Sequence, residues 1–176
     1  MIRELVFDFM CGEEVFVIEI VAVDLALPAH ADAVLMMMSG YSLDAMGAGK
    51  ALPEVVKAEL IPRLRERTDY LGVLAFEGAE PAGLVHGFEG FSTFMARPLL
   101  NIHDVYVAPS HRGQGLAPRM LTRIEVLARE RGCGKLTLEV LEGNAPAQAS
   151  YRKCGFDAYT LDPAMGRALF WEKKLV

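Results

Sequence analysis

The chain has 176 residues, 52% of them hydrophobic, which suits one folded domain with a sizeable core and argues against disorder. Its formal net charge is −5, which argues against nucleic-acid binding, because that binding rests on cationic contacts to phosphates. The three cysteines, Cys11, Cys133 and Cys154, lack metal-ligand spacing, so we expect free thiols in a reducing compartment and no metal site.

The amino-terminal region has the pattern of neither a signal peptide nor a membrane span. Charged residues such as Arg3 and Asp8 interrupt the first ten residues, so no uninterrupted apolar core precedes a cleavage site. The apolar region 15–38 is broken by Glu19 and Asp32, whereas a membrane helix needs about 20 nearly uninterrupted apolar residues. We therefore expect a soluble, cytoplasmic protein.

The first part of the chain predicts a strand and two helices. The β-branched run at residues 15–23 is typical of a strand, and Pro28 suits the first turn of a helix over residues 29–38. Glycines interrupt residues 40–49, which we leave unassigned. A second helix covers residues 53–67. Its expected apolar face consists of Val55, Val56, Leu60 and Leu64.

Three strands are expected next. Residues 70–76 and 82–88 flank a turn-forming segment and predict an antiparallel hairpin. Residues 91–98 have the composition of a loop or a strand end. Residues 99–107 form a third apolar run, which leads into a turn with two glycines.

The rest of the chain predicts helices alternating with strands. A strongly periodic helix over residues 116–131 ends at Gly132, and the aliphatic segment 135–141 is typical of a buried parallel strand. A short helix follows at residues 144–153. Two closing strands are expected at residues 156–160 and 168–174. The order of elements indicates a single α/β domain with a mixed sheet over residues 1–176.

The glycine turn between the third strand and the long helix predicts an anion site. Gly113 and Gly115 allow a sharp bend and leave no side chains over the backbone amides. The helix that begins at Leu116 directs its unsatisfied N–H groups, and the positive end of its dipole, toward this turn. A strand, a glycine turn and a helix amino terminus in this order commonly bind a phosphate.

Four motifs in and around this turn resemble those of one enzyme superfamily. They are Asp104-Val-Tyr-Val, Arg112-x-x-Gly115-x-Ala117, Glu142-Gly-Asn144-Ala-Pro-Ala147 and Tyr151-x-x-x-Gly155-Phe156. Their order and spacing between residues 99 and 156 are similar to those of the GNAT acetyl-CoA-dependent N-acetyltransferases. The resemblance implies the GNAT acyl-CoA N-acyltransferase fold: a mixed, mostly antiparallel sheet, with a splayed central pair of parallel strands, flanked by helices.

The same resemblance implies acetyl-CoA as cosubstrate and assigns residues to it. The residues expected to bind the pyrophosphate are Arg112, Gly113, Gln114, Gly115, Leu116 and Ala117. Those expected to bind the pantetheine arm are Val105, Tyr106 and Val107. Asn144 and Ala147 belong to the motif on the other side of the splayed strands; Asn144 would bond the cofactor, cap the short helix, or do both. Pro118 has no N–H to donate, so we keep it as a lining residue only.

Tyr151 and His103 are the expected catalytic residues. Tyr151 matches the tyrosine that serves many family members as general acid, although a purely packing role is the alternative. His103 stands where polyamine acetyltransferases carry a glutamate, and an imidazole can accept a proton near neutral pH; a hydrogen-bonded sheet histidine is the alternative. Glu139 and His86 are weaker candidates for the base.

Asp104 would attract a cationic amine, but its position relative to His103 depends on the local backbone. Simple alternation along a strand places the two side chains on opposite faces. A β-bulge, which is common beside active sites, could redirect either one.

The resemblance therefore implies acetyl transfer from acetyl-CoA to a primary amine, by direct attack in a ternary complex. Phe91-Ser-Thr-Phe94 and the neighbouring strand are similar to the polyamine and thialysine acetyltransferase branch, which favours a small-molecule amine over a protein substrate. The alternatives are a protein N-acetyltransferase and an inactive acyl-CoA-binding module. Because many relatives pair through their closing strands, we expect a homodimer by analogy.

Overall fold

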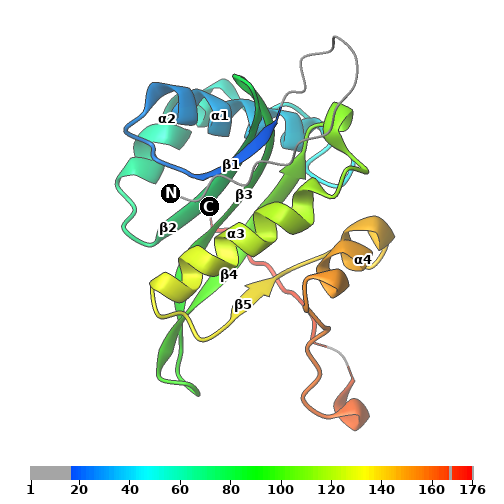
Figure 1. Ribbon diagram of the computed structural model, residues 1–176. Coiled ribbons are helices and arrows are strands. Elements are labelled where there is room, and N and C mark those ends of the chain that lie inside the picture. Colours follow the sequence, from blue (N-terminus) through cyan, green and yellow to red (C-terminus); the bar gives the residue numbers. More distant parts are fainter. Residues whose placement is uncertain (1–16, 167, 176) are drawn as a thin grey trace.

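The computed structural model describes residues 17–166 and 168–175, in which five strands form one sheet (Figure 1). The strands are β1 (Ile18–Ala22), β2 (Tyr70–Glu77), β3 (Glu80–Ser92), β4 (Arg97–Val107) and β5 (Leu136–Leu138). They lie in the order β1-β2-β3-β4-β5; adjacent strands from β1 to β4 are antiparallel to one another, and β5 is parallel to β4. The expected mixed, mostly antiparallel sheet is confirmed. Cys11 and the first ten residues, considered above, lie outside the described residues.

Helices cover both faces of this sheet. They are α1 (Pro28–Leu43), α2 (Glu54–Arg65), α3 (Leu116–Glu130) and α4 (Ala145–Lys153), with short 3-10 turns η1 (Pro109–His111) and η2 (Pro163–Met165). Figure 1 shows α1 and α2 on one face of the sheet and α3 on the other, with α4 beyond α3. In the part of the chain that the structure describes, no helix is long and apolar enough to cross a bilayer.

Each face of the sheet has its own apolar cluster. On the α3 side, Leu121 and Ile124 pack with Val85 and Ile102 of the sheet. On the other side, Val34 and Met37 of α1 pack with Leu84. Because side chains alternate along a strand, each strand supplies residues to both clusters. The sheet is therefore held rigidly between two layers of helix.

Helix α1 is longer than the sequence pattern indicated, because Gly40 does not end it. A Cβ atom at this position would lie 2.7 Å from the Tyr106 hydroxyl, so the missing side chain lets α1 approach β4 closely. The helix continues to Leu43 and brings the unassigned segment into the structure beside the carboxyl end of β4.

The apolar face expected for α2 is only partly correct. Leu64 is buried and Leu60 partly buried against the cluster that holds α1, but Val55 and Val56 are exposed. Ile61, which was not expected, is buried. Only the carboxyl-terminal half of α2 packs against this cluster, so the valines of its first turn are exposed.

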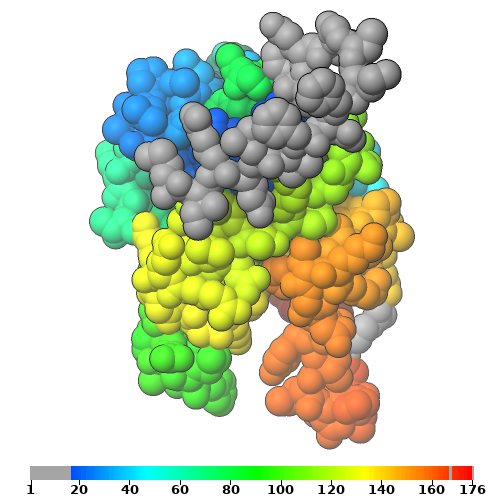
Figure 2. Space-filling view, viewed as in Figure 1, coloured from blue at the N-terminus to red at the C-terminus, as the bar shows by residue number. Residues whose placement is uncertain are grey.

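The two closing strands are not formed, and this expectation is wrong. In residues 17–166 and 168–175 the sheet ends at β5, so the parallel pair lies at its edge rather than in its centre. The segment after α4 projects from the body of the molecule beside a hollow (Figure 2), and Leu169, Phe170 and Trp171 are exposed. An apolar run indicates strand propensity, but a strand also needs a hydrogen-bonded neighbour, and β5 pairs over only three residues.

Candidate active site

Strands β4 and β5 separate after a short paired stretch. Their register joins Leu100 to Leu136, Asn101 to Thr137 and Ile102 to Leu138. Strand β4 then continues to Val107, and on that side no strand of the described residues pairs with it. A strand edge left open in this way presents backbone N–H and C=O groups that an extended, amide-bearing molecule can pair with. The splayed parallel pair predicted from the sequence is present, and Val105, Tyr106 and Val107 lie on its open part.

A β-bulge stands where the two strands begin to separate. His86 is opposite Asp104 and Gly87 is opposite Ile102, which leaves His103 as the extra residue of β4. The His103 ring lies 5.3 Å from that of Phe88, while Asp104 bonds to His86. His86 and Phe88 are two residues apart and share a face of β3, so the bulge brings His103 and Asp104 to the same face.

The glycine turn leaves a run of backbone amides without acceptors. Gly113 and Gly115 have φ of +77° and +72°, and a Cβ atom at either would meet nothing within 4 Å. In the described chain, no acceptor bonds to the amide N–H groups of Gly113, Gln114, Gly115, Leu116 and Ala117. These amides stand at the amino terminus of α3, where the helix dipole is positive. The turn therefore has the properties of an anion site.

The Arg112 side chain extends away from this turn toward α1. Its Nε donates to the Val107 carbonyl at 3.0 Å, and its Nη2 donates to the Asp44 carboxylate at 2.7 Å. The guanidinium also lies 5.7 Å from the centre of the Tyr106 ring. Arg112 therefore joins the end of β4 to the end of α1, and its backbone remains the part that faces the turn.

His111 anchors the beginning of the turn to the hairpin of β2 and β3. This side chain is buried, with Nε2 at 3.1 Å from the Glu77 carboxylate and Nδ1 at 2.9 Å from the Ser110 hydroxyl. The hydrogen bonds limit movement of the residues that precede Gly113. A held turn suits ligand binding, because less conformational entropy is lost when the ligand arrives.

Tyr151 lies on α4 and packs against the α3-side cluster. Its ring makes an edge contact with Phe156, with ring centres 6.0 Å apart. Burial, and to a lesser extent the neighbouring Tyr41, raises the pKa of Tyr151 to about 12. The phenol consequently keeps its proton at neutral pH and can donate it. The packing contact is present; the role of general acid stays a prediction.

Asn144 caps α4, as expected. Its side-chain oxygen accepts from the Ala147 amide at 3.2 Å, which satisfies one of the free N–H groups of the first turn. The same bond occupies the amide of Ala147. Contact of Asn144 or Ala147 with a cofactor stays a prediction.

Tyr41 of α1 belongs to this site, and sequence reasoning missed it. Its ring lies 5.8 Å from that of Tyr106. Burial, followed by the carboxylates of Asp104 and Asp44, raises the pKa of Tyr41. One signal could have found it, because Tyr41 follows the buried Met37 by four residues and so lies on the same helix face, provided that the helix passes Gly40.

The other candidates for the base lie in different surroundings. Glu139 is exposed just beyond β5, where it accepts a hydrogen bond from Asn101 at 3.2 Å. His86 is buried behind Asp104, with 2.6 Å between Nε2 and the Asp104 oxygen Oδ2. His86 therefore reaches the open part of the site through Asp104. Nothing in the sequence pattern indicated this pairing.

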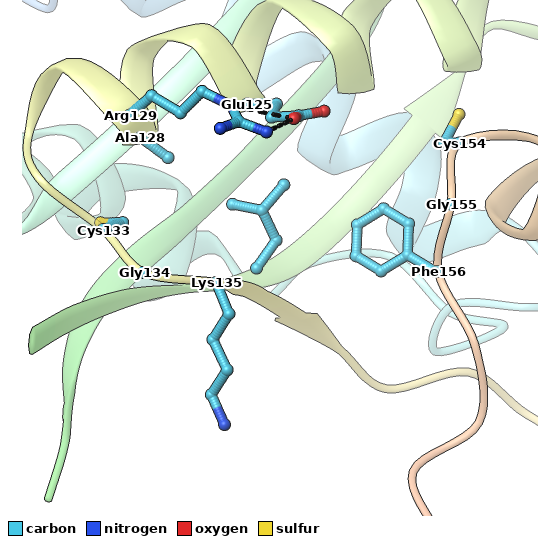
Figure 3. Close-up of a pocket in the computed structure, with 10 residues that line it drawn as sticks. Glu125, Ala128, Arg129, Cys133, Gly134, Lys135, Cys154, Gly155 and Phe156 are labelled. Atoms are coloured by element: carbon cyan, nitrogen blue, oxygen red, sulfur yellow. Dashed lines mark hydrogen bonds and ion pairs between the residues drawn. The ribbon is translucent and has the colours of Figure 1, made fainter. Parts of the chain in front are cut away.

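A cavity of about 200 Å³ lies elsewhere, near the other end of α3 (Figure 3). It is bounded by the last turns of α3, the start of β5 and the chain after α4, and Phe156 points into it. Cys133 and Cys154 both line it as free thiols. None of the residues that the motifs assign to catalysis or to the cofactor lines this cavity. In the described part of the chain, no three His, Cys, Asp or Glu side chains are gathered as metal ligands would be.

Solved structures with the same fold include acetyltransferases. A probable acetyltransferase superposes with a TM-score of 0.73 at 23% identity, covering 89% of this chain and 99% of that one. An aminoglycoside acetyltransferase from an uncultured soil metagenomic sample, solved with sisomicin, superposes with a TM-score of 0.70 at 12% identity, covering 90% and 97%. At these identities the likeness establishes the fold alone.

Curated relatives match over shorter stretches. Streptothricin acetyltransferase from Streptomyces lavendulae is 42% identical over 83 residues, which cover 47% of this chain and 44% of that protein. Thialysine N-epsilon-acetyltransferase from Caenorhabditis elegans is 36% identical over 80 residues, covering 46% and 49%. The matches thus span about half the length of these curated relatives.

The family model for the acetyltransferase (GNAT) family matches residues 42–156. That range includes the bulged strand, the glycine turn, α3, α4 and Tyr151, which are the parts of the site described above. It also covers more than half of the 176 residues. The chain belongs to the GNAT acetyltransferase family.

Proposed function

We propose that this protein transfers an acetyl group from acetyl-CoA to a primary amine of a small molecule, by direct attack in a ternary complex. One observation carries the proposal: a run of free amides at the amino terminus of α3 stands beside the open edge of β4. Coenzyme A has a pyrophosphate that the free amides can bind and an arm of peptide-like amides that the open strand edge can pair with. The residues present therefore fit this cosubstrate.

Each part of the donor has a matching group in the chain. The amides from Gly113 to Ala117 would hold the pyrophosphate, with Pro118 as a lining residue that donates nothing. Val105, Tyr106 and Val107 would pair with the pantetheine arm along the open strand edge. Asn144 and Ala147 would approach the arm from the start of α4.

The reaction forms a bond between the amine nitrogen and the acetyl carbon and breaks the bond between that carbon and the sulfur. His103 takes the proton that the amine must lose, because an alkylammonium with a pKa of about 10 has no lone pair for attack. A backbone N–H near Val105 stabilises the oxyanion that develops on the carbonyl. Tyr151 gives its proton to the departing thiolate. His103→Ala should then alter the acidic limb of the pH–rate profile, and an identical profile would remove His103 as base.

The charges of the site favour a cationic acceptor. Asp44 is paired with Arg112, and Glu139 accepts from Asn101. Asp104 bonds to His86 through Oδ2 alone and keeps 24% of its side chain exposed beside the open edge. We therefore assign the binding of the ammonium form to Asp104. The names of two relatives, streptothricin acetyltransferase and thialysine N-epsilon-acetyltransferase, support a small-molecule acceptor.

Release of free thiol from acetyl-CoA, measured over a panel of small primary amines and amino-terminal peptides, tests this function. Turnover with small amines supports it, and turnover with peptides alone would favour the protein N-acetyltransferase. Tight binding of acetyl-CoA without turnover would indicate the inactive binding module. A cytoplasmic location and a homodimer belong to the same proposal. Cell fractionation tests the location, and sedimentation of the purified protein tests the dimer.

A further inference from the structure

Three polar side chains from neighbouring strands form a chain of hydrogen bonds behind the acceptor side of the site. The Tyr70 hydroxyl of β2 lies 3.3 Å from Nδ1 of His86 on β3. The other ring nitrogen of His86, Nε2, lies 2.6 Å from Oδ2 of Asp104 on β4. The chain thus runs across three adjacent strands and ends at the bulge.

Appreciable exposure is confined to the Asp104 end of this chain. Tyr70 is buried, His86 is 3% exposed, and Asp104 is the member that reaches the surface, with 24% of its side chain exposed. Its second oxygen, Oδ1, makes no hydrogen bond within the described residues. A buried imidazole costs free energy unless both ring nitrogens are satisfied, and here both have partners. The arrangement leaves one carboxylate oxygen free toward the site.

The protonation states along the chain follow from its chemistry. Burial, and then the charge of Asp104, raises the pKa of Tyr70, so this phenol keeps its proton and donates it to Nδ1. With Nδ1 as acceptor, the neutral ring of His86 carries its proton on Nε2 and donates it to Asp104. Each donor then has an acceptor, and the Asp104 carboxylate accepts the last hydrogen bond of the chain.

Other charged and titratable groups lie near Asp104, but none of those that the structure describes forms a hydrogen bond to it in place of His86. Tyr41 and Asp44 approach from α1, and the charge of Asp104 raises the pKa of Tyr41. His103 is exposed beside Asp104 and contacts Phe88, whose ring also lies 5.3 Å from the Arg67 guanidinium. Arg112, just beyond the end of β4, is paired with Asp44. Within the described residues, His86 is the donor that holds the Asp104 carboxylate.

We propose that His86 is a positioning residue of the acceptor site, which, oriented by Tyr70, fixes the Asp104 carboxylate so that its free oxygen receives the positively charged amine. This inference rests on the proposed function, since it names residues that serve the binding of its acceptor. A carboxylate on a bulged strand has freedom to rotate, and a charge-assisted hydrogen bond removes that freedom before the amine arrives. His86 acts through Asp104 and touches neither substrate.

Steady-state kinetics of His86→Leu and His86→Gln separate positioning from folding. His86→Leu removes the donor, and the KM for the amine should rise by roughly 10-fold or more, with the KM for acetyl-CoA unchanged, because a hydrogen bond to a charged group is lost. His86→Gln can place an amide N–H near the position of Nε2 and should recover most of that affinity. Equal amine KM values in the wild type and in His86→Leu would overturn the proposal.

A double-mutant cycle tests whether His86→Leu changes the amine KM by its effect on Asp104. In the Asp104→Asn background, His86→Leu should cause no further change in the amine KM, because the carboxylate that it positions is already gone. Additive effects of the two substitutions would contradict the proposal. A general loss of structure would instead raise both KM values and lower the melting temperature of His86→Leu and His86→Gln alike, and this outcome also counts against positioning.

Nitrogen NMR of the histidine ring gives a readout that does not depend on turnover. The wild type should show His86 protonated on Nε2, and Asp104→Asn should shift that resonance. A ring protonated on Nδ1 alone would overturn the proposal. A wild type that acetylates no amine refutes the proposed function, whereas an active wild type with the wrong ring proton refutes this inference by itself.

Discussion

Arg112 donates a hydrogen bond to Asp44 over 2.7 Å, although the two residues are 68 positions apart in the chain. Asp44 is the C-cap residue of α1, and Arg112 is the residue just before Gly113. This pair joins the segment proposed to bind the donor to the helix that covers the acceptor side. Through it, the position of the glycine turn depends on a helix that the motif itself does not include.

Replacement of Asp44 by Asn should weaken acetyl-CoA binding modestly. Arg112 would lose its ionised partner, and a partly exposed ion pair is worth about 1 kcal/mol or less, so we expect an increase of up to about 5-fold in the Kd for acetyl-CoA. Asp69→Asn is the matched control, because it breaks an exposed aspartate–arginine pair with Arg67, away from the turn. An equal effect of the two substitutions would show that the Asp44 pair does not act on the turn.

The same pair has a defined pH dependence. The Met46 amide and then the Arg112 guanidinium lower the pKa of Asp44 below its usual value. A carboxyl group with a lowered pKa in the folded protein contributes its stabilisation above the unfolded pKa and loses it as pH falls through the folded value. The difference in melting temperature between the wild type and Asp44→Asn should therefore stay constant from neutral to mildly acidic pH and shrink only below the usual pKa of aspartate. A difference that vanishes near pH 6 would contradict this ionisation.

Gly115→Asp should abolish binding of acetyl-CoA. It adds a negative charge beside the free amides and a side chain where φ is +72°, a conformation that costs a non-glycine residue roughly 1 to 2 kcal/mol. Gly132→Asp is matched in strain, because Gly132 has φ of +79° and lies beyond the other end of α3, also with nothing near its Cβ position. Titration calorimetry should show binding to the second variant only. Retained affinity in Gly115→Asp would count against the pyrophosphate assignment.

Tyr151→Phe should lower kcat by about 100-fold with little change in the Kd for acetyl-CoA, because the phenyl ring keeps the contact with Phe156 but has no proton to give. Since the pKa of Tyr151 is raised to about 12, its deprotonation should produce no basic limb in the pH–rate profile below that pH. Tyr159→Phe, at an exposed tyrosine after α4, serves as control. If both variants turn over like the wild type, Tyr151 has only its packing role.

The indole of Trp171 reports on the carboxyl-terminal segment. It is the chain's single tryptophan and is 83% exposed. Its fluorescence should have the red-shifted maximum of a solvated indole, and Trp171→Ala should change the free energy of unfolding by no more than about 0.5 kcal/mol. Blue-shifted emission, or a loss of several kcal/mol, would show that this segment packs against an apolar surface.

Elements that depend on nearby residues could be predicted from the sequence. Helix α3 follows from its apolar periodicity, and its ends follow from Gly115 and Gly132, which adopt positive φ. The cap of α4 follows from Asn144, which bonds to an amide three residues away. In each case the residue that predicts the feature interacts with residues only a few positions away, so a short stretch of sequence is enough to predict it.

Features that depend on distant residues could not be predicted in this way. The expected strand at residues 168–174 has suitable composition, but whether it pairs depends on a neighbour that no local pattern specifies. The contact of Arg112 with Asp44 and the burial of His86 behind Asp104 join separate elements. Gly40 was taken as an interruption because its packing partner, Tyr106, lies far along the chain. The motifs therefore located the expected donor side, while much of the expected acceptor side became visible only in three dimensions.

The central claim is that the amides of the glycine turn hold the pyrophosphate of coenzyme A. Proton–nitrogen NMR of the labelled protein, recorded while coenzyme A is added, tests it most directly. The resonances of Gly113, Gln114, Gly115, Leu116 and Ala117 should shift together at saturation, while that of Gly132 should stay in place. Coenzyme A that binds and leaves these five amides unshifted, or that fails to bind at all, would contradict the account.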